Sequence, residues 1–562
     1  MNKSNTEVKT TVEWKSLPWH KLEKATFKLQ KRIYQASGRE DYRTVKRLQK
    51  TLIRSWSAKC LAVRKVTQEN QGRKTAGVDG HKELNPAQRL TLVKTLKLSG
   101  KADPTRRVWI SKPGKKEMRP LGIPTMYDRA LQALVKMALE PEWEALFEPN
   151  SFGFRPGRSC HDAIEAIYGA IKQKPKYVLD ADIARCFDKI NHDALLKKLN
   201  ATPNIRRQIK SWLKAGVMDG ETLFPTEEGT PPCGVVSPLL ANIALHGLEE
   251  HLMQYAETGD DKNIYGRQQS WKSKRMALSV IRYADDFAIL HKDLQVIHAC
   301  QQIVSDWLTG MGLELKPEKT SVSHTLQKIN GKHGFSFLGF SIQQYEVGKH
   351  ASKQGFKTII TPHKEKLKNH VKQLVKLINR HKGSSRDALI ATLNPMIRGW
   401  ANYYKTVCSK DIFQLADHLV YQQIRGWGTY RHEKMENLWH SKPGMSWTFA
   451  TKDGQHWLAK HGDTKITRHI KVKGDKSPYD GDWVYWSTRR GMYPQTPKQV
   501  AKLLFEQKGR CSHCGHYFST ESLLEVHHID QNRNNNKPNN LTAVHRHCKK
   551  KFTGCGTLKH GK

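Results

Sequence analysis

Short apolar runs and longer stretches of helical periodicity alternate along the chain, and the clearest short runs surround an acidic pair. Residues 280–281 and 287–290 are apolar on either side of Asp285 and Asp286. Such runs between polar residues predict strands, so we expect residues 279–283 and 287–290 to form a hairpin. Its turn presents both aspartates together, although it lacks the Gly or Asn that tight hairpin turns favour.

A second strand-like run, residues 177–183, carries another acid well upstream of this pair. Transfer of a nucleotide to a primer hydroxyl uses two Mg²⁺ ions roughly 3.5–4 Å apart, held by carboxylates on stiff backbone. Asp182, Asp285 and Asp286 are therefore the expected catalytic residues and magnesium ligands. Ile183, next to Asp182, is included among the expected magnesium ligands as well. An Asp-Asp pair is also common in solvated turns, and spacing alone leaves that alternative open.

Two longer segments have the period of amphipathic helices. Residues 19–66 predict two basic helices that are separated by a break at Gly38. Asn394-Pro395 predicts another helix start, with Asn as the N-cap and Pro at the first helical position. Beyond it, Arg398 and Lys405 lie on a stripe apart from the apolar face. We expect this stripe to contact nucleic acid.

The charge balance favours a polyanionic partner. The 562 residues include 95 Lys and Arg against 52 Asp and Glu, a formal net charge of +43 that is spread along the chain. Such a surface binds phosphates with release of counterions, and the alternative is a generally basic protein without such a partner. No run of 18 apolar residues occurs, and residues 1–11 lack an apolar signal segment. We therefore expect a cytoplasmic protein and no membrane partner.

Four residues near the end of the chain have the spacing of a metal site. Cys511-x-x-Cys514 and His545-x-x-Cys548 are typical of two knuckles that share one tetrahedral zinc ion. The other cysteines are mostly scattered, as in a reducing compartment. The spacing predicts a structural Zn²⁺ held by Cys511, Cys514, His545 and Cys548.

The order of several motifs resembles that of group II intron-encoded proteins. RYADDF (282–287) is similar to the metal-binding motif of reverse transcriptases, and DADIARCFDKINH (180–192) is similar to their first carboxylate motif. TLNPMIRGWANYYK (392–405) resembles the maturase segment of intron-encoded proteins. The remaining blocks are RPLGIP (119–124), NSFGFRPGRS (150–159), GTPPCGVVSPLLAN (229–242), GLELKPEKT (312–320) and FSFLGF (335–340).

This resemblance implies an α+β fold: a right-hand polymerase with fingers, palm and helical thumb, followed by a small zinc-bound ββα domain of the HNH endonuclease type. It also implies a function in the bacterial cytoplasm or nucleoid. The protein would bind its group II intron RNA, assist splicing, and reverse transcribe that RNA from dNTPs at a target DNA nicked by the HNH domain. The implied domains are a basic N-terminal extension (1–66), fingers and palm (67–345), the maturase or thumb domain (346–440), a DNA-binding region (441–500) and the HNH domain (501–562).

The resemblance assigns further residues to the polymerase substrate. Lys112 and Arg119 are expected to neutralise the triphosphate of the incoming dNTP. Phe187 is expected to lie against the 2′ carbon of its sugar and to exclude a ribose hydroxyl. Where the family usually has Pro-Gln-Gly-Gly, this chain has Pro-Pro-Cys-Gly, and Pro232-Cys233 would lower polymerase activity.

VHHID (526–530) and NNL (539–541) resemble the motif of HNH nucleases. By motif position, His528 is the general base, His527 ligates the divalent ion of the nuclease, and Asn540 orients the base. Family members commonly have a histidine directly after the last zinc cysteine, but this chain has Lys549, whose ammonium has no lone pair for a metal. Either His547 replaces that ligand, or the domain is a zinc-stapled DNA-binding module without catalysis.

Two other functions stay open. The chain could be a splicing maturase whose polymerase is weakened and whose nuclease is inactive, an alternative that Pro232-Cys233 and Lys549 support. It could also be the reverse transcriptase of a defence system. Residues 392–405 and the HNH-like tail argue against the latter.

Overall fold

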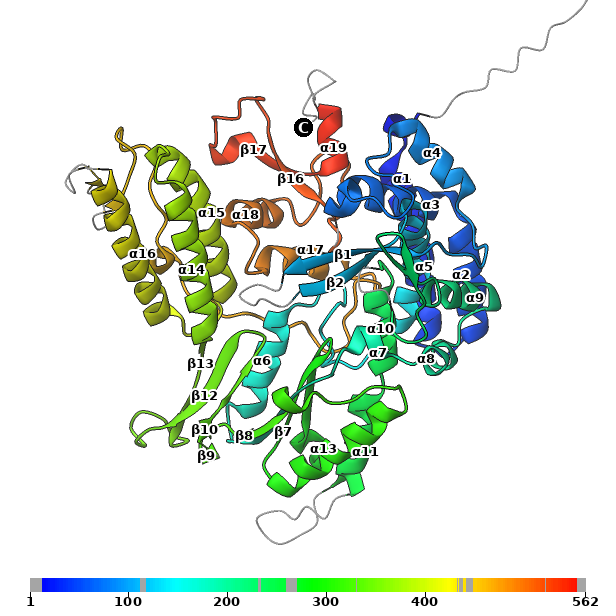
Figure 1. The fold of residues 1–562 in the computed structure, drawn as a ribbon, viewed down its shortest axis with the longest axis horizontal. Helices are drawn as coiled ribbons and strands as arrows, with labels where there is room; N and C mark the ends of the chain where they lie inside the picture. Colours follow the sequence, from blue (N-terminus) through cyan, green and yellow to red (C-terminus); the bar gives the residue numbers. More distant parts are fainter. Residues whose placement is uncertain are drawn as a thin grey trace, which may run out of the picture.

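The computed structural model describes residues 13–111, 118–230, 234–258, 270–329, 331–431, 433, 438–440, 448–520 and 522–552. Lys112 and the Pro232-Cys233 pair lie outside these ranges. Helices and sheets are mixed throughout the described part of the chain. Figure 1 shows the N-terminal helices on one side, a helical bundle on the opposite side, and the last segments of the chain between their upper ends.

Three helices form the N-terminal segment: α1 (Trp19–Ser37), α2 (Tyr42–Arg54) and α3 (Trp56–Arg64). The prediction of two helices is wrong in number, because the chain breaks at Ser55 as well as near Gly38. The extended backbone of Ser55 lets Ile53 and Ala58 both enter one core, which a continuous helix would not allow. All three helices pack against α5 (Met126–Glu144).

A first four-stranded sheet has the order β2-β1-β4-β5. Its strands are β1 (Thr105–Ser111), β2 (Met118–Ile123), β4 (Val217–Asp219) and β5 (Thr222–Phe224). β1 and β2 are antiparallel, and Arg119 lies opposite Ile110 near their shared end.

The second four-stranded sheet, of order β6-β7-β3-β8, carries the predicted catalytic residues. Its strands are β3 (Tyr177–Asp182), β6 (Ser279–Tyr283), β7 (Asp286–His291) and β8 (Ser321–His324), all antiparallel to their neighbours. Because successive side chains alternate between faces, Leu179 and Ile289 join the core beneath α13 (Leu294–Thr309). Val178 and Leu290 join a second core with α6 (Cys160–Ile171). The sheet is therefore covered on both faces.

A three-stranded sheet leads into the helical bundle. Its strands are β11 (Phe335–Phe337), β12 (Phe340–Glu346) and β13 (Phe356–Pro362). The bundle consists of α14 (Lys364–Arg380), α15 (Arg386–Tyr404) and α16 (Lys410–Tyr430), which Figure 1 shows lying side by side.

The predicted helix start at Asn394-Pro395 is wrong. α15 begins at Arg386 behind the N-cap Ser385, and Pro395 lies inside it. Burial of Leu389 and Leu393 extends the apolar face upstream, so packing carries the helix through the proline. Asn394 does not cap the helix: its side chain donates to the Trp457 carbonyl at 2.9 Å and accepts from the Ala459 amide at 2.6 Å.

The C-terminal segment begins with α17 (Trp483–Met492) and α18 (Lys498–Glu506). The antiparallel strands β16 (Leu524–His528) and β17 (Leu541–His545) follow, and α19 (Arg546–Phe552) continues from β17. This ββα arrangement has a small core of its own, to which Leu504, Phe518 and Val544 belong.

A buried charge cluster fixes residues 469–489 to α6. Asp162 is fully buried, and its Oδ1 accepts from His469 Nε2 at 3.0 Å, from the Val472 amide at 2.8 Å and from Arg489 Nη2 at 2.5 Å. Burial raises the pKa of Asp162, but the hydrogen bond from His469 and the charge of Arg489 outweigh it and lower the pKa to about 2. His469, Val472 and Arg489 lie in the expected DNA-binding region, and their contacts with Asp162 hold that region against α6.

Among the helices of the described segments, none has the length and apolar character that crossing a bilayer requires. The remaining elements are α4 (Pro86–Thr95), α7 (Cys186–Lys189), α8 (His192–Leu199), α9 (Pro203–Leu213), α10 (Ser237–Leu245), α11 (Leu248–Thr258), α12 (Trp271–Ala277), β9 (Lys328–Ile329), β10 (Lys332–His333), β14 (Trp439–His440) and β15 (Thr448–Phe449).

Candidate active site

β6 and β7 form the predicted hairpin, and its turn is tight. Tyr283 pairs with Asp286, so β7 begins at Asp286 and the turn has two residues, Ala284 and Asp285. Ala284 has a φ of +59°, a left-handed conformation that costs a residue with a Cβ about 1–2 kcal/mol. The turn therefore depends on support from outside the hairpin.

Two other segments supply that support. A Cβ on Gly153 would lie 2.2 Å from the Ala284 amide nitrogen, so only glycine permits this approach. Asn242 Nδ2 donates to the Gly153 carbonyl at 2.8 Å. Arg282 Nη1 donates to Asn242 Oδ1 at 3.1 Å and to the Ala284 carbonyl at 3.3 Å. The left-handed residue is thus held by Arg282 of the hairpin itself and by Gly153 and Asn242 from outside it.

Pairing of β3 with β7 brings the predicted aspartates together. Asp182 lies directly opposite Asp286, which places their Cβ atoms roughly 4.5–5.5 Å apart on one face of the sheet. Asp285 adjoins Asp286 in the turn, and its carbonyl accepts from the Ile183 amide at 3.3 Å. One end of the sheet therefore presents three carboxylates from two neighbouring strands.

Ile183 can offer a metal only its backbone carbonyl, because its side chain has no donor atom. The isolated bridge at this residue consists of hydrogen bonds from the Lys316 amide to the Asp182 carbonyl (2.8 Å) and from the Ala184 amide to the Glu314 carbonyl (2.9 Å). The Ile183 carbonyl takes no part in that bridge. Three carboxylates and this carbonyl make an all-oxygen donor set of the kind that Mg²⁺ prefers, so the residues present fit the expected ion.

Burial and mutual repulsion disfavour ionisation of these carboxyls. Burial, followed by the charges of Asp285 and Asp182, raises the pKa of Asp286 to about 6. Burial also raises the pKa of Asp285. Asp180 lies on the same face of β3 as Asp182, and burial together with the charges of Asp286 and Asp182 raises its pKa to about 7. A divalent cation would relieve this crowding of like charges.

Lys319 is a site residue that the sequence motifs did not assign. Its ammonium forms an ion pair with Asp182, and its side chain is 55% exposed. Burial lowers the pKa of Lys319, but the hydrogen bond to Asp182 outweighs this effect and raises it. The only signal in the sequence was the position of Lys319 within residues 312–320. Its charge offsets part of the negative charge of the three aspartates.

Phe187, on α7, packs against a second ring that the sequence motifs also did not assign. The Phe187 and Phe154 rings meet edge to face, with centroids 5.9 Å apart and planes at 76°. Phe154 is 46% exposed and has a φ of +60°, so a bulky residue is held in a strained, open position beside Gly153. The two rings form an aromatic wall near the hairpin turn.

Arg119 influences the same site through its charge. It is among the cations that counteract the effect of burial on the pKa of Asp285 and of Asp188. Lys112, its expected partner at the triphosphate, lies outside the described residues. The position of Arg119 on β2 thus agrees with a role at the substrate, without testing it.

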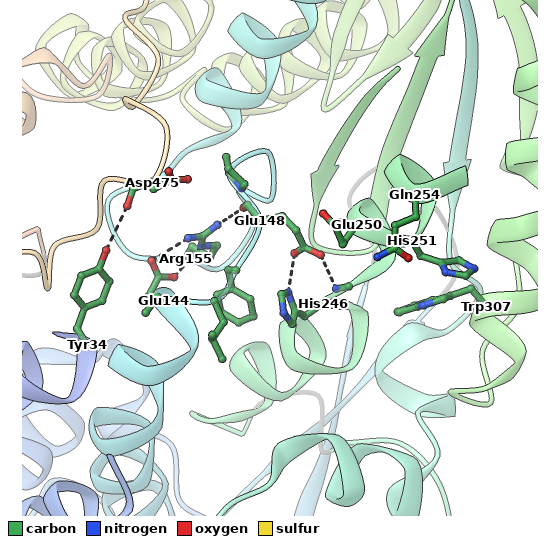
Figure 2. Close-up of a pocket in the computed structure, with 15 residues that line it drawn as sticks. Tyr34, Glu144, Glu148, Arg155, His246, Glu250, His251, Gln254, Trp307 and Asp475 are labelled. Carbon is green, nitrogen blue, oxygen red and sulfur yellow. Dashed lines mark hydrogen bonds and ion pairs between the residues drawn. The ribbon is translucent and has the colours of Figure 1, made fainter. Parts of the chain in front are cut away.

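The segment that carries Gly153 is fixed at its base by hydrogen bonds to Glu148. Glu148 accepts from His246 Nδ1 at 2.9 Å and from the Gly247 amide at 2.5 Å. Burial raises the pKa of Glu148, but the hydrogen bond from His246 and its charge lower the pKa to about 2. These residues line a cavity of about 540 Å³, in which Figure 2 shows Glu148 between Arg155 and His246.

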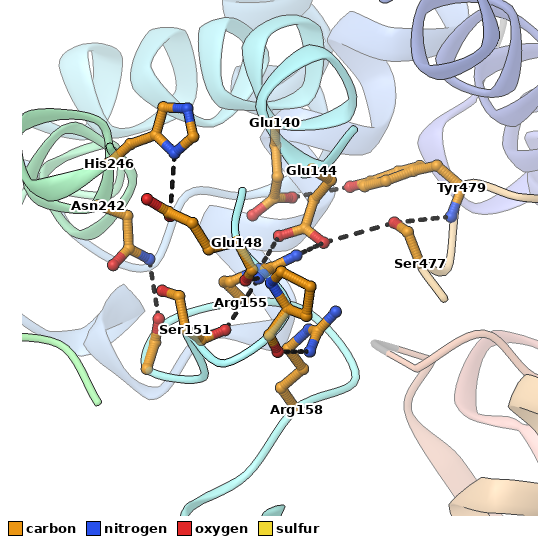
Figure 3. Close-up of polar contacts among 12 residues, drawn as sticks. Glu140, Glu144, Glu148, Ser151, Arg155, Arg158, Asn242, His246, Ser477 and Tyr479 are labelled. Carbon is orange, nitrogen blue, oxygen red and sulfur yellow. Dashed lines mark hydrogen bonds and ion pairs between the residues drawn. The ribbon is translucent and has the colours of Figure 1, made fainter. Parts of the chain in front are cut away.

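Arg155 closes the same segment into a loop. Its guanidinium donates to Glu144 at 2.8 Å, to the Glu148 carbonyl at 2.7 Å and to the Ser151 carbonyl at 2.9 Å. Figure 3 shows that Glu144 is also contacted by Ser477, which lies far along the chain. Hydrogen bonds of Arg155 and Glu144 therefore hold this loop in place. Through Gly153, the loop in turn supports the hairpin turn.

The predicted zinc ligands are brought together in the C-terminal ββα unit. One ligand atom from each of Cys511, Cys514, His545 and Cys548 lies within 4.8 Å of the others. Cys511, His545 and Cys548 are buried, and the Cys511 thiol accepts from the His545 amide at 3.4 Å. Three thiols and one imidazole are a donor set that suits tetrahedral zinc, so these residues fit the predicted ion.

The predicted HNH residues lie on β16 and beside β17. His528 Nε2 contacts Asn536 Oδ1 at 3.2 Å. Asn540 bonds to Asp530, accepting from its amide at 2.9 Å and donating to its carboxylate at 2.7 Å. Within the described residues, Asn540 thus fixes the loop after His528, and Asn536, which the motifs did not assign, is the residue that contacts the His528 ring.

α19 directs its side chains to different neighbours. His547 stacks on His545, with ring centroids 5.1 Å apart, and its Nδ1 lies 3.7 Å from Glu23 of α1. Lys549 Nζ instead lies 3.1 Å from Glu525, and after burial it is the main cause that lowers the pKa of His527. Residues two apart on a helix point in roughly opposite directions, so Lys549 lies toward β16 while His547 lies toward α1 and His545.

The structure does not bring Arg398 and Lys405 into the aspartate site. Both lie at α15, where Arg398 is exposed and Lys405 is half-buried at its C-terminal end. Burial, followed by the charge of Lys498, lowers the pKa of Lys405. The predicted nucleic-acid stripe is therefore a separate surface of the helical bundle.

Comparison with known families matches most of the chain. The family described as reverse transcriptase (RNA-dependent DNA polymerase) matches residues 110–342, and the N-terminal domain of reverse transcriptase matches residues 14–96. The group II intron, maturase-specific domain matches residues 365–443. In chain order, the three matches cover the N-terminal helices, the segment that contains both four-stranded sheets, and the helical bundle.

Similar curated proteins come from several kinds of organism. Protein YkfC of Escherichia coli is 31% identical over 348 residues, which are 56% of this chain and 87% of that protein. Group II intron-encoded protein LtrA of Lactococcus lactis is 30% identical over 373 residues, and the chain spans 60% of its length. Maturase-like protein 1 of Euglena gracilis is 27% identical over 462 residues, 79% of this chain and 88% of that protein.

Proposed function

Because the chain belongs to the family of group II intron-encoded reverse transcriptases and maturases, we propose that it binds a group II intron RNA, assists its splicing and copies it into DNA. The reverse transcriptase match supports the expected right-hand polymerase fold, and the mixture of helices and sheets agrees with it. The observation that carries the polymerase proposal is the pairing of Asp182 with Asp286 beside Asp285.

In this proposal, the chain's own residues position the reactants. Asp182, Asp285 and Asp286 would hold two Mg²⁺ ions, which when bound activate the primer hydroxyl and stabilise the leaving diphosphate. The guanidinium of Arg119 offsets the negative charge of the triphosphate. The Phe187 ring lies against the sugar, where a ribose hydroxyl would clash with it. The hairpin needs no rearrangement to present its aspartates, because its turn is already held by Gly153 and Asn242.

Assistance in splicing rests on a different surface. A group II intron RNA supplies its own active site, so the protein needs only to grip and fold the RNA. The basic stripe of α15, with Arg398 and Lys405, is the surface we assign to this grip. The maturase-specific match over residues 365–443 supports this assignment over a defence-system reverse transcriptase.

This division of labour predicts that splicing and polymerisation can be separated. Arg398→Ala with Lys405→Ala should weaken binding of a group II intron RNA, and should reduce the salt slope of binding by roughly one for each phosphate that the variant no longer neutralises. Asp285→Asn with Asp286→Asn should leave splicing at low magnesium intact. Splicing assays and filter binding across a salt series measure both effects.

Lys502→Ala is the matched control, because Lys502 is an exposed lysine that already pairs with Glu506 on α18. It should change neither splicing nor the salt slope. An equal loss of splicing in the aspartate variant and in the α15 variant would contradict two separate surfaces.

A second activity, nicking of target DNA by an HNH domain, is favoured by the antiparallel ββα arrangement with its Cys/His cluster. His528 would act as general base and His527 would ligate the divalent ion. Against it stands Lys549, whose ammonium lies near His527 and pairs with Glu525. The alternative is a zinc-stapled module that binds DNA without cutting it.

Two substitutions distinguish these alternatives. His528→Ala should leave zinc content at about one ion per chain and abolish nicking of target DNA by the ribonucleoprotein. Lys549→His should increase nicking if the missing ligand limits an otherwise intact site. Zinc analysis and strand-specific nicking assays measure both. If the unmodified protein and the Lys549→His variant both fail to nick, the DNA-binding alternative stands.

A further inference from the structure

A cavity of about 730 Å³ lies where the N-terminal helices meet the zinc-ligand segment. Its walls come from α1, α3 and α5, from the start of α17, from the segment between α18 and β16 that contains two of the zinc ligands, and from residues 545–547. Figure 1 shows the last helix, α19, beside the N-terminal helices. The volume is in the range of about 300–1,000 Å³ that is usual for sites binding small organic groups.

Aromatic rings form one part of the wall. Trp483 of α17 and Tyr517 of the zinc-ligand segment are nearly parallel, at 5°, with centroids 6.4 Å apart. Phe27 of α1 packs against Trp483, with centroids 4.1 Å apart. All three side chains line the cavity and are only partly buried, so their faces are accessible to a planar group.

The residues that line the cavity carry a net positive charge, which the acidic residues of the lining do not neutralise. Its three acids are already paired: Glu23 and Glu69 with Arg64, at 2.6 and 2.8 Å, and Glu140 with Lys136 at 3.2 Å. Three more lysines of α1 line the cavity at helical spacing: Lys24, Lys28 and Lys31. In the described part of the chain, none of these three lysines has an acidic partner.

Arg510 adds a fourth cation at the aromatic pair. Its guanidinium lies over the Tyr517 ring, 4.3 Å from the centroid, and donates to the Tyr517 hydroxyl at 2.8 Å. A planar ring system and several phosphates are the two chemical features that parallel aromatic side chains and unpaired cations recognise together. A lone phosphate would leave the aromatic faces unused, and a duplex would keep its base faces stacked inside.

We propose that this cavity binds a single-stranded stretch of nucleic acid, with one unstacked base against Trp483 and Tyr517 and the adjoining phosphates along Lys24, Lys28 and Lys31. The proposal rests on the proposed function in taking nucleic acid as the ligand, and adds a place that is distinct from the polymerase aspartates. Since α1 and the zinc-ligand segment both contribute walls, neither end of the chain makes this site alone.

The test uses the full-length protein and short single strands that contain 2-aminopurine, whose fluorescence is quenched when it stacks on an aromatic ring. One strand is DNA and the other is RNA of the same sequence, so that the two arms identify which of them the cavity takes. The unmodified protein should quench at least one of these strands. Tyr517→Ala should weaken its binding roughly tenfold or more and remove the quench.

Lys24→Ala with Lys28→Ala changes only side chains at the surface of α1, so folding should be unaffected. This variant should lower the salt slope of binding by about 1.4, because each phosphate contact on a single strand contributes about 0.7. Trp271→Ala is the matched aromatic control, since Trp271 is 63% exposed on α12 and does not line the cavity. It should bind and quench as the unmodified protein does.

Unchanged quench and affinity in both the Tyr517 and the lysine variants would overturn the proposal, as would equal losses in Trp271→Ala. Primer extension by the same preparations separates this result from the proposed function. Extension without a Tyr517-dependent quench refutes the cavity alone. A Tyr517-dependent quench in a protein that neither extends primers nor assists splicing would support the cavity and refute the proposed function.

Discussion

Replacing Asp285 and Asp286 together by asparagine is expected to reduce primer extension on an RNA template by roughly a thousandfold or more, to background. Asparagine keeps the shape of the turn but removes two of the three charges that would hold the metal ions. Because burial and mutual repulsion raise the pKa of both carboxyls, the same change should leave the thermal stability of the fold unchanged or higher. Extension assays with Mg²⁺ and a thermal melt measure the two effects.

Asp306→Asn provides the matched control, because Asp306 is an exposed acid on α13 whose side chain contacts Gln302 among the described residues. Its extension rate should equal that of the unmodified protein. Extension that survives the double change would show that the metal ligands are misassigned. If the unmodified protein itself does not extend primers, the splicing-only alternative is favoured. Pro232-Cys233 would then be the first candidate cause of the lost polymerase activity.

Replacing Cys511 and Cys514 by serine, or removing the metal with a chelator, is expected to unfold the C-terminal ββα unit. The core of this unit is small, and domains of this size commonly take several kcal/mol of folding free energy from a bound zinc ion. Limited proteolysis and amide hydrogen exchange should show loss of protection in β16, β17 and α19, while the palm keeps its protection. Elemental analysis should find about one zinc per chain before the change and none after it.

Cys408→Ser is the control for thiol replacement, because Cys408 is exposed and lies outside the cluster of ligands. It should retain both the zinc and the protection pattern. A metal-free protein whose β16 and β17 remain protected would refute a structural zinc.

Features encoded by neighbouring residues could be predicted, and features made by distant contacts could not. The hairpin and its aspartates follow from apolar runs of strand length, and the zinc ligands follow from their spacing. Lys319 and Phe154 lie within quoted motifs, but nothing in those motifs indicates their contacts, because the folded chain is what brings Lys319 to Asp182 and Phe154 beside Phe187.

The wrong predictions of helix starts and breaks have the same cause. Asn394-Pro395 has the local chemistry of a helix start, yet α15 runs through it, since burial of Leu389 and Leu393 upstream outweighs the capping preference. The additional break at Ser55 serves the packing of α2 and α3 on α5. In both places, the core that the helix enters determines where the helix begins and ends.

The cluster around Asp162 makes the predicted boundary at residues 440 and 441 a poor place to divide the protein. Asp162 lies on α6, but two of its partners, His469 and Arg489, come from beyond that boundary. A fragment that ended there would keep a buried carboxylate on α6 without the guanidinium of Arg489, and loss of one side of such a buried pair costs about 3–5 kcal/mol. Part of the interior around α6 is thus completed by residues 469–489, so a fragment that ends near residue 440 is expected to be less stable than the same segment in the full chain.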